Sequence, residues 1–305
     1  MLEAIGKNGN HDDGDRAVEA ARASGRRRTP WPLVVVAVLF IVVPFLTWYL
    51  TWFGRTLSDS EIESYLGDGN ARHAQHALSQ IAGRIEERDE KRRAGKKADG
   101  AGAERWYPQV VALTRSDVAD LRMTAAWVMG LDHSSEEFHA ALVPLLEDPE
   151  PIVRRNAALA LVRFGDPRCR AELLAMLRPY TVRAAAGGAA LTSLTAGSPV
   201  KRESLLLKYR DSSGGVGEVR SPLPGRIERA LVKEGDAFAQ GAELFVLAPD
   251  AEQVTDALVG LYYFGTAEDL PDVESYARGV EGMPDDVKDS AAQTAEAIKR
   301  RMGGK

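Results

Sequence analysis

The sequence contains few of the residues that covalent or metal chemistry requires. It has one cysteine, Cys169, so no disulfide bond can form within the chain. It has no Gly-x-Ser-x-Gly, Cys-x-x-Cys, His-Glu-x-x-His or phosphate-binding-loop motif. His73 and His76 have the spacing of one helix face, but no carboxylate or cysteine pattern beside them completes a zinc site. We therefore predict that the protein is not an enzyme, and we expect no catalytic residue, metal or cofactor.

The sequence also lacks an excess of positive charge. Lysine and arginine total 39 against 44 acidic residues, which gives a formal net charge of −5 and a pI near 5.7. The charged run at 89–104 contains basic residues but only low-complexity neighbours, without the aromatic side chains on which bases stack. We interpret this run as a solvated loop and predict that the protein does not bind nucleic acid.

One long apolar segment is present, at residues 31–53, and it contains no charged residue. As a helix it would reach roughly 34 Å, enough to cross a bilayer. Trp31 lies at one end and Trp48 and Trp52 at the other, as in interfacial aromatic belts, and membrane helices tolerate a proline such as Pro44. A cleaved signal peptide would have a shorter apolar region and a small-residue cleavage site. We therefore predict a transmembrane anchor.

The charges around this segment predict its orientation. Five arginines precede it, at positions 16, 22 and 26–28, whereas Arg55 and Arg72 are the only arginines in the comparable stretch after it. The positive-inside rule then places the N-terminus in the cytoplasm. Residues 1–30 are polar, without apolar periodicity, and are predicted to be a disordered cytoplasmic tail. The composition suggests a bacterium, so we expect a single-pass protein of the cytoplasmic (inner) membrane whose bulk is periplasmic.

A helical motif occurs twice in the middle of the chain. Leu-Arg-x-x-Ala-Ala at 121–126 returns as Val-Arg-x-x-Ala-Ala at 153–158, and an amphipathic segment with an Asp-Pro turn precedes the second copy. Small alanines allow paired helices to pack closely, and the proline stops the first helix. This pattern resembles the HEAT repeat, which implies a stacked α-solenoid with an extended concave surface that binds other proteins.

Further copies of the motif define the domain organisation. Residues 254–265 resemble another copy of the second helix. They lie one repeat length after the copy at 153–158 when residues 182–250 are not counted, and residues 287–301 resemble the next copy. We therefore predict HEAT-like repeats over 54–181 and 251–305. The segment 182–250 would be inserted inside a repeat, between a first helix at 168–177 and its second helix.

The inserted segment has its own internal repeat. Residues 188–209 align with 225–247, so that Leu194 matches Leu231 and Gly197 matches Gly235, and each half has two apolar strands joined at a glycine turn. Residues 221–247 resemble the second half of a biotinyl/lipoyl-type domain, a barrel-sandwich hybrid. The resemblance implies that a lysine in the hairpin between the halves would carry the cofactor. Here that position falls near Gly214, and Lys208 lies before the turn.

The predicted fold is therefore mainly α with a small all-β insert: a HEAT-like α-solenoid interrupted by a lipoyl-like barrel-sandwich and preceded by one transmembrane helix. The predicted function is that of a membrane-anchored exocytoplasmic scaffold, an accessory or assembly subunit of a membrane complex. We expect Trp106, Tyr107 and Trp127 mainly in the repeat core, with at least one aromatic side chain left exposed. The candidates for partner contact are Arg155, Trp127 and Tyr263.

Two other functions remain open at this point. Similar small barrels occur in periplasmic adaptors of transport systems, although a long helical hairpin separates their halves and the linker here is short. Some HEAT-like proteins are lyases or enzyme accessory proteins, although this sequence offers no catalytic set.

Overall fold

The computed structural model describes residues 31–52, 56–96 and 102–303. The chain divides into two units, residues 1–56 and residues 57–305. In the first unit the described part is the helix α2 (Trp31–Trp52). The predicted tail at 1–30 and the last residue of the predicted anchor lie outside the described residues.

Helix α2 is 22 residues long and includes Pro44. Trp31 is 76% exposed at its first position, and Trp48 and Trp52 lie in its last two turns. Across the described segments, no helix has the combined length and apolar character that crossing a membrane requires. The transmembrane anchor therefore stays a prediction.

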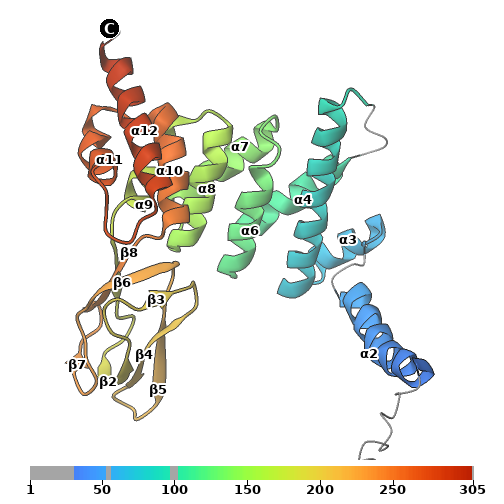
Figure 1. The fold of residues 1–305 in the computed structure, drawn as a ribbon, viewed down its shortest axis with the longest axis horizontal. Helices are drawn as coiled ribbons and strands as arrows, with labels where there is room; N and C mark the ends of the chain where they lie inside the picture. The colour runs from blue at the N-terminus through green and yellow to red at the C-terminus, as the bar shows by residue number, and fades with distance from the viewer. Residues whose placement is uncertain (1–30, 53–55, 97–101, 304–305) are drawn as a thin grey trace, which may run out of the picture. The chain divides into compact units, whose positions relative to one another are not determined.

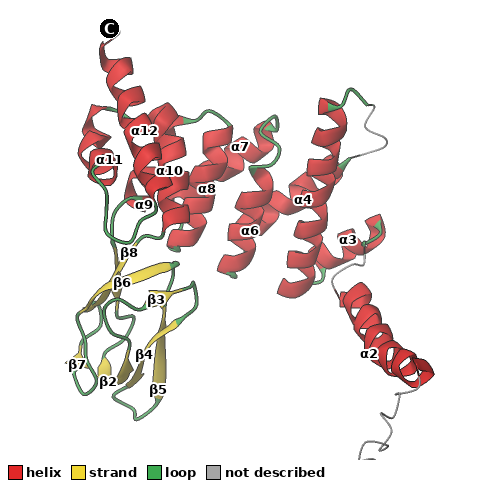
Figure 2. Ribbon diagram, viewed as in Figure 1, coloured by secondary structure: helices red, strands yellow, loops and turns green. Residues whose placement is uncertain are grey.

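The second unit is mainly helical (Figures 1 and 2). Its helices follow one another as packed pairs, and 3₁₀ segments adjoin several of them. In chain order they are α3 (Asp59–Gly67), α4 (Ala71–Arg93), η1 (Ala103–Trp106), α5 (Tyr107–Ala112), η2 (Leu113–Arg115), α6 (Ala119–Met129), α7 (Glu136–Leu142), η3 (Val143–Glu147), α8 (Pro151–Arg163), η4 (Pro167–Cys169), α9 (Arg170–Met176), α10 (Ala251–Phe264), η5 (Ala267–Asp269), α11 (Leu270–Ala277) and α12 (Asp285–Gly303).

The second helices of these pairs form a row in which α4 packs on α6, α6 on α8, α8 on α10 and α10 on α12 (Figure 1). Alanines at the contacts, including Ala125, Ala157 and Ala257, are fully buried. Because alanine brings the helix backbones close together, the apolar core runs continuously along the row. The predicted mainly helical, repeat-containing fold is confirmed.

Local sequence explains where the helices begin. Ser58 forms a capping box with Glu61 at the start of α3, and Asn70, Ser135 and Asp250 accept backbone N–H bonds at the starts of α4, α7 and α10. Pro151 occupies the first turn of α8, where no N–H donor is needed.

The charged run at 89–104 is only partly a loop. Helix α4 continues through it to Arg93, and residues 97–101 lie outside the described part of the chain. At the other end of the run, Ala103 is 1% exposed and Glu104 accepts a 2.6 Å hydrogen bond from Arg88. The buried alanine and this ion pair attach the end of the run to the helical core.

The strands form two antiparallel sheets of four strands each. One sheet has the order β1-β8-β6-β3 and the other β5-β4-β2-β7. The strands are β1 (Tyr180–Arg183), β2 (Gly188–Ser193), β3 (Pro199–Val200), β4 (Leu205–Arg210), β5 (Val216–Arg220), β6 (Gly225–Ala230), β7 (Ala237–Phe238) and β8 (Glu243–Ala248). The two sheets have equivalent strand orders. If β1, β2, β3 and β4 change places with β5, β6, β7 and β8, respectively, the order of one sheet becomes that of the other. This equivalence agrees with the alignment of the two sequence halves. The sheets share a separate apolar core that includes Leu206, Leu207, Leu244 and Phe245.

The strands interrupt a packed pair of helices. They follow α9 and precede α10, yet these two helices pack against each other. β1 and β8 are neighbouring antiparallel strands, with Tyr180 opposite Leu247, so the chain leaves and re-enters the helices at adjacent points. An insertion of this length therefore leaves the helix pair intact.

Candidate protein-binding groove

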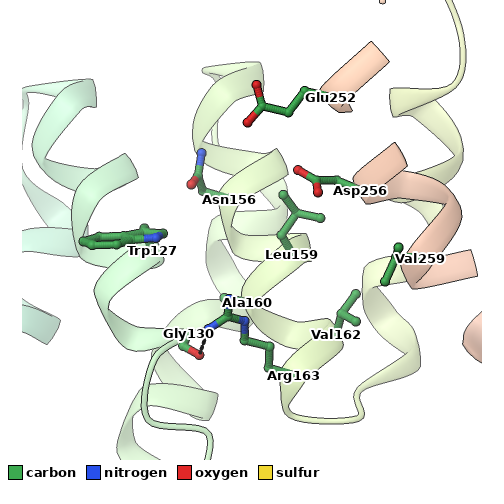
Figure 3. Close-up of a pocket in the computed structure, with 10 residues that line it drawn as sticks. All are labelled: Trp127, Gly130, Asn156, Leu159, Ala160, Val162, Arg163, Glu252, Asp256 and Val259. Carbon is green, nitrogen blue, oxygen red and sulfur yellow. Dashed lines mark hydrogen bonds between the residues drawn. The ribbon is translucent and has the colours of Figure 1, made fainter. Parts of the chain in front are cut away.

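A groove of about 480 Å³ lies on the face formed by α6, α8 and α10 (Figure 3). Residue 127 on α6, residues 156–163 on α8 and residues 252–259 on α10 meet there, although the inserted sheets separate α10 from the other two in the sequence. The groove is lined by Trp127, Gly130, Asn156, Leu159, Ala160, Val162, Arg163, Glu252, Asp256 and Val259.

Close packing of α6 on α8 shapes the floor of the groove. A Cβ atom placed on Gly130 would lie 2.8 Å from Ala160 Cβ and 3.0 Å from Ala160 Cα. Glycine at the end of α6 therefore permits α6 and α8 to lie closer together than a larger residue would allow. Leu159 and Ala160 form the middle of the floor, between Trp127 on one side and Asp256 on the other (Figure 3).

The exposed face of α10 changes from acidic to apolar along its length. Glu252, Asp256, Val259 and Tyr263 recur at the four- and three-residue spacings that place side chains on one helix face. Val259 is 50% exposed and Tyr263 is 61% exposed. This stripe supplies the α10 wall of the groove and continues beyond it to Tyr263.

Trp127 supplies the opposite wall, from α6. It is 43% exposed, so this tryptophan is not part of the repeat core, whereas Trp106 and Tyr107 are buried as expected. Trp106 packs in the first repeats, and Tyr107 donates a 2.6 Å hydrogen bond to the buried Asp132. Exposed aromatic side chains of this size are typical of protein contacts.

The acidic and basic side chains lie at different ends of the groove (Figure 3). Arg163 donates a 3.4 Å hydrogen bond to the carbonyl oxygen of Gly130. Glu252 and Asp256 make no side-chain hydrogen bond or ion pair with the other described residues. Partial burial raises the pKa of Asp256, and the neighbouring carboxylates of Glu252 and Asp250 raise it further, while Arg163 acts in the opposite direction. Neither carboxylate at the acidic end is therefore neutralised by an ion pair among the described residues.

Arg155 occupies a different place from the one predicted. It is 5% exposed, and its guanidinium donates a hydrogen bond to Gln253 Oε1. Gln253 in turn donates a 2.6 Å bond to the carbonyl oxygen of Met176, and Glu172 Oε1 lies 3.9 Å from Arg155 Nε. Burial lowers the pKa of Arg155 to about 10, against the influence of Glu172. A buried arginine offers no surface to a partner, so Arg155 holds α8, α9 and α10 together instead.

The arginines of the repeated motif, Arg122 and Arg154, stabilise the turn between two repeat helices. Arg122 forms a bidentate pair with Asp148, with N–O distances of 2.7 and 2.9 Å. Arg154 donates to the carbonyl oxygens of Asp148 and Pro149, at 2.7 and 3.2 Å. These bonds fix the turn between η3 and α8, which explains the arginine in each copy of the motif.

The histidine pair offers no metal site. His73 Nδ1 bonds to the carboxylate of Asp68, and its ring stacks on Tyr65 with centroids 4.2 Å apart. Within the described residues, no group of three or more His, Cys, Asp or Glu side chains could hold a metal ion.

The β4–β5 hairpin carries no lysine at its tip. Asp211 Oδ1 accepts hydrogen bonds there from the backbone N–H groups of Ser213 and Gly215, at 2.8 and 2.9 Å, and Gly214 has a positive φ of 89°. Lys208 lies on β4, where its Nζ is 3.8 Å from Glu218. The side chains at the tip therefore stabilise a tight turn.

The acidic residues of the groove, Glu252 and Asp256, were missed by sequence reasoning. Their spacing with Val259 and Tyr263 is a detectable helical stripe, but only packing on α8 shows that this stripe faces Trp127. Of the three predicted contact residues, the structure brings Trp127 into the groove, leaves Tyr263 exposed one turn beyond Val259 and buries Arg155.

Comparison with known proteins supports the repeat architecture. A family model described as HEAT repeats matches residues 107–191. A TPR repeat-containing protein of Pseudomonas aeruginosa is 32% identical over 172 residues, which cover 54% of this chain and 65% of that protein. The chain thus spans just under two thirds of that relative.

A solved structure of a single-chain, multi-domain long-chain acyl-CoA carboxylase also matches. The match covers 33% of this chain and 10% of the carboxylase chain, at 18% sequence identity and a TM-score of 0.23. A likeness this weak carries no argument. The family match and the packed helix pairs agree, and together they support a repeat-containing protein, in which the similarity to HEAT repeats spans residues 107–191.

Proposed function

We propose that the protein is a membrane-anchored exocytoplasmic scaffold that binds another protein through the groove between α6, α8 and α10. The observation that carries this proposal is the set of exposed apolar side chains, Trp127 on α6 and Val259 and Tyr263 on α10, the two second helices on either side of α8. Large exposed apolar side chains cost free energy in water unless a partner covers them. Repeat solenoids use such faces to bind proteins.

The membrane anchor in this proposal is the segment that includes α2. Its support comes from the sequence: an uncharged apolar run flanked by aromatic residues, with arginines concentrated before it. Anchoring would confine the scaffold to the membrane plane and raise its effective concentration near a membrane partner.

The inserted barrel acts in this proposal as a rigid module without carrier chemistry. Its support is the resemblance of 221–247 to biotinyl/lipoyl domains and the absence of lysine from the β4–β5 hairpin tip. Intact mass of the purified protein tests this point. The expected mass is that of the unmodified chain, and a biotinyl or lipoyl increment would show that the barrel carries a cofactor.

Crosslinking in intact membranes followed by affinity purification tests the scaffold function. The variant carries Trp127→Ala and Tyr263→Ala together. The matched control is Leu231→Ala, because Leu231 has the same 43% exposure as Trp127 but lies in the barrel. We expect the wild type and the control to recover the same crosslinked protein, and the double variant to recover at least tenfold less. Recovery of the chain alone, with no reproducible partner, would refute the scaffold function.

A further inference from the structure

We propose that the acidic end of the groove binds a basic segment of the partner protein, in which a lysine or arginine lies next to a large apolar side chain. This inference rests on the proposed protein-binding function and adds the chemistry of the bound segment.

The charge of the groove supports a cationic occupant. Glu252 and Asp256 lie one turn apart on α10, both exposed, and neither has an ion pair within the described residues. The nearby carboxylate of Asp250 accepts a 2.9 Å bond from the backbone N–H of Gln253, which caps the helix and leaves the local charge negative. A cation placed between Glu252 and Asp256 would relieve the repulsion among these carboxylates.

The apolar part of the groove supports a large side chain beside that cation. Val259 follows Asp256 by one turn, Leu159 lies on the floor and Trp127 forms the opposite wall. The volume of about 480 Å³ lies within the range of pockets that enclose ligands. The methylene stem of lysine or arginine can itself cover apolar surface while its charged end reaches a carboxylate.

Arg163 gives the bound segment a direction. It lies at the opposite end of the groove from Glu252 (Figure 3). A uniformly basic segment would meet like charge there, so the basic residue belongs at the Glu252 end and an uncharged or acidic residue at the Arg163 end. A metal ion is not favoured as occupant, because no group of three suitable ligand side chains occurs among the described residues.

The test is selection of binding peptides from a random 12-residue peptide library, using the full-length protein in a neutral detergent. Selected peptides are then measured by fluorescence anisotropy against wild type, a Glu252→Gln/Asp256→Asn variant and Trp127→Ala. The matched control is Asp289→Asn, which removes an exposed carboxylate on α12, away from the groove.

We expect the selected peptides to be enriched in lysine or arginine beside leucine or an aromatic residue. Removal of both groove carboxylates should weaken their binding roughly three- to tenfold, as for two partly exposed charge pairs. Asp289→Asn should bind as the wild type does, and added salt should weaken binding to the wild type.

Two kinds of contrary result can be told apart. Neutral or acidic peptides that need Trp127, or basic peptides that bind the carboxylate-free variant equally well, would overturn the basic-segment inference and leave the groove as the binding site. No enrichment of any peptide, or peptides indifferent to Trp127→Ala, would contradict the proposed groove as well.

Discussion

Replacing Gly130 with alanine tests how closely α6 and α8 approach each other. The backbone at Gly130 has φ −66° and ψ −15°, which alanine adopts without strain, so any cost arises from packing. The new Cβ would lie 2.8 Å from Ala160 Cβ and 3.0 Å from Ala160 Cα, whereas carbon atoms normally pack at about 3.5–4.0 Å. Because Ala160 Cα belongs to the backbone, no rotamer change relieves the contact and α8 itself must shift.

The expected loss follows from two opposing contributions. Overpacking of this kind costs about 1–3 kcal/mol. Alanine restricts the unfolded chain and recovers about 0.4–1 kcal/mol. Taking the middle of each range, we expect Gly130→Ala to lower the free energy of unfolding by about 1.3 kcal/mol.

The assay is urea unfolding of the full-length protein in neutral detergent, followed by far-UV circular dichroism. With a urea slope of about 1–3 kcal/mol per molar, a loss of 1 kcal/mol lowers the midpoint by roughly 0.3–1 M. The matched control is Gly83→Ala in α4, where nothing lies within 4 Å of the added Cβ. That change should stabilise the helix by about 0.5–1 kcal/mol. If Gly130→Ala matched the wild type or the control, the close α6–α8 contact would be wrong.

Three further predictions concern pH, thiol reactivity and orientation. Burial opposes ionisation of Asp132, but hydrogen bonds from Ser134 and Tyr107 and the ion pair with Arg88 outweigh it and lower its pKa from 3.8 to about 2. The lowered pKa stabilises the folded protein by about 2 kcal/mol above pH ~4, and this stabilisation is lost as the pH falls through about 2. Unfolding measured at decreasing pH should therefore show the difference in stability between wild type and Asp132→Asn narrowing by about 2 kcal/mol. Cys169 is fully buried, and burial raises the pKa of its thiol to about 12, so a maleimide should label it only on unfolding; rapid labelling of the folded protein would contradict its burial. Ser213→Cys, at the exposed hairpin tip, should react with a membrane-impermeant maleimide in intact spheroplasts if this part of the chain is exocytoplasmic, and labelling only after lysis would reverse the proposed orientation.

The repeat architecture could be predicted from sequence because its signals are local. The Ala-Ala spacing at 121–126 and 153–158 reflects which helix face packs, and the turn proline marks where a helix stops. The insertion of a strand-rich segment was also detectable, since leaving out 182–250 restores the repeat spacing. The absence of lysine from the hairpin tip can likewise be read directly from residues 211–217.

The exposure of single side chains was less predictable. Trp127 was expected mainly in the core and is 43% exposed, while Arg155 was expected at the surface and is 5% exposed. Adjacent positions on a helix such as α8 face different neighbours, so a small rotation of the helix decides which arginine is buried. That rotation depends on how α8 packs against α9 and α10, and the sequence of α8 alone does not specify this packing.

The sequence by itself determined the kind of protein: paired helices, an inserted sheet segment with an internal repeat, and one uncharged apolar segment. Only the tertiary structure shows the groove that we propose as the binding face. It brings Glu252 and Asp256 opposite Trp127 because α10 packs on α8 and α9, although the inserted strands separate α10 from both helices in the sequence. Contacts between residues this far apart in the chain arise from the packing of complete helices, and no local pattern specifies them.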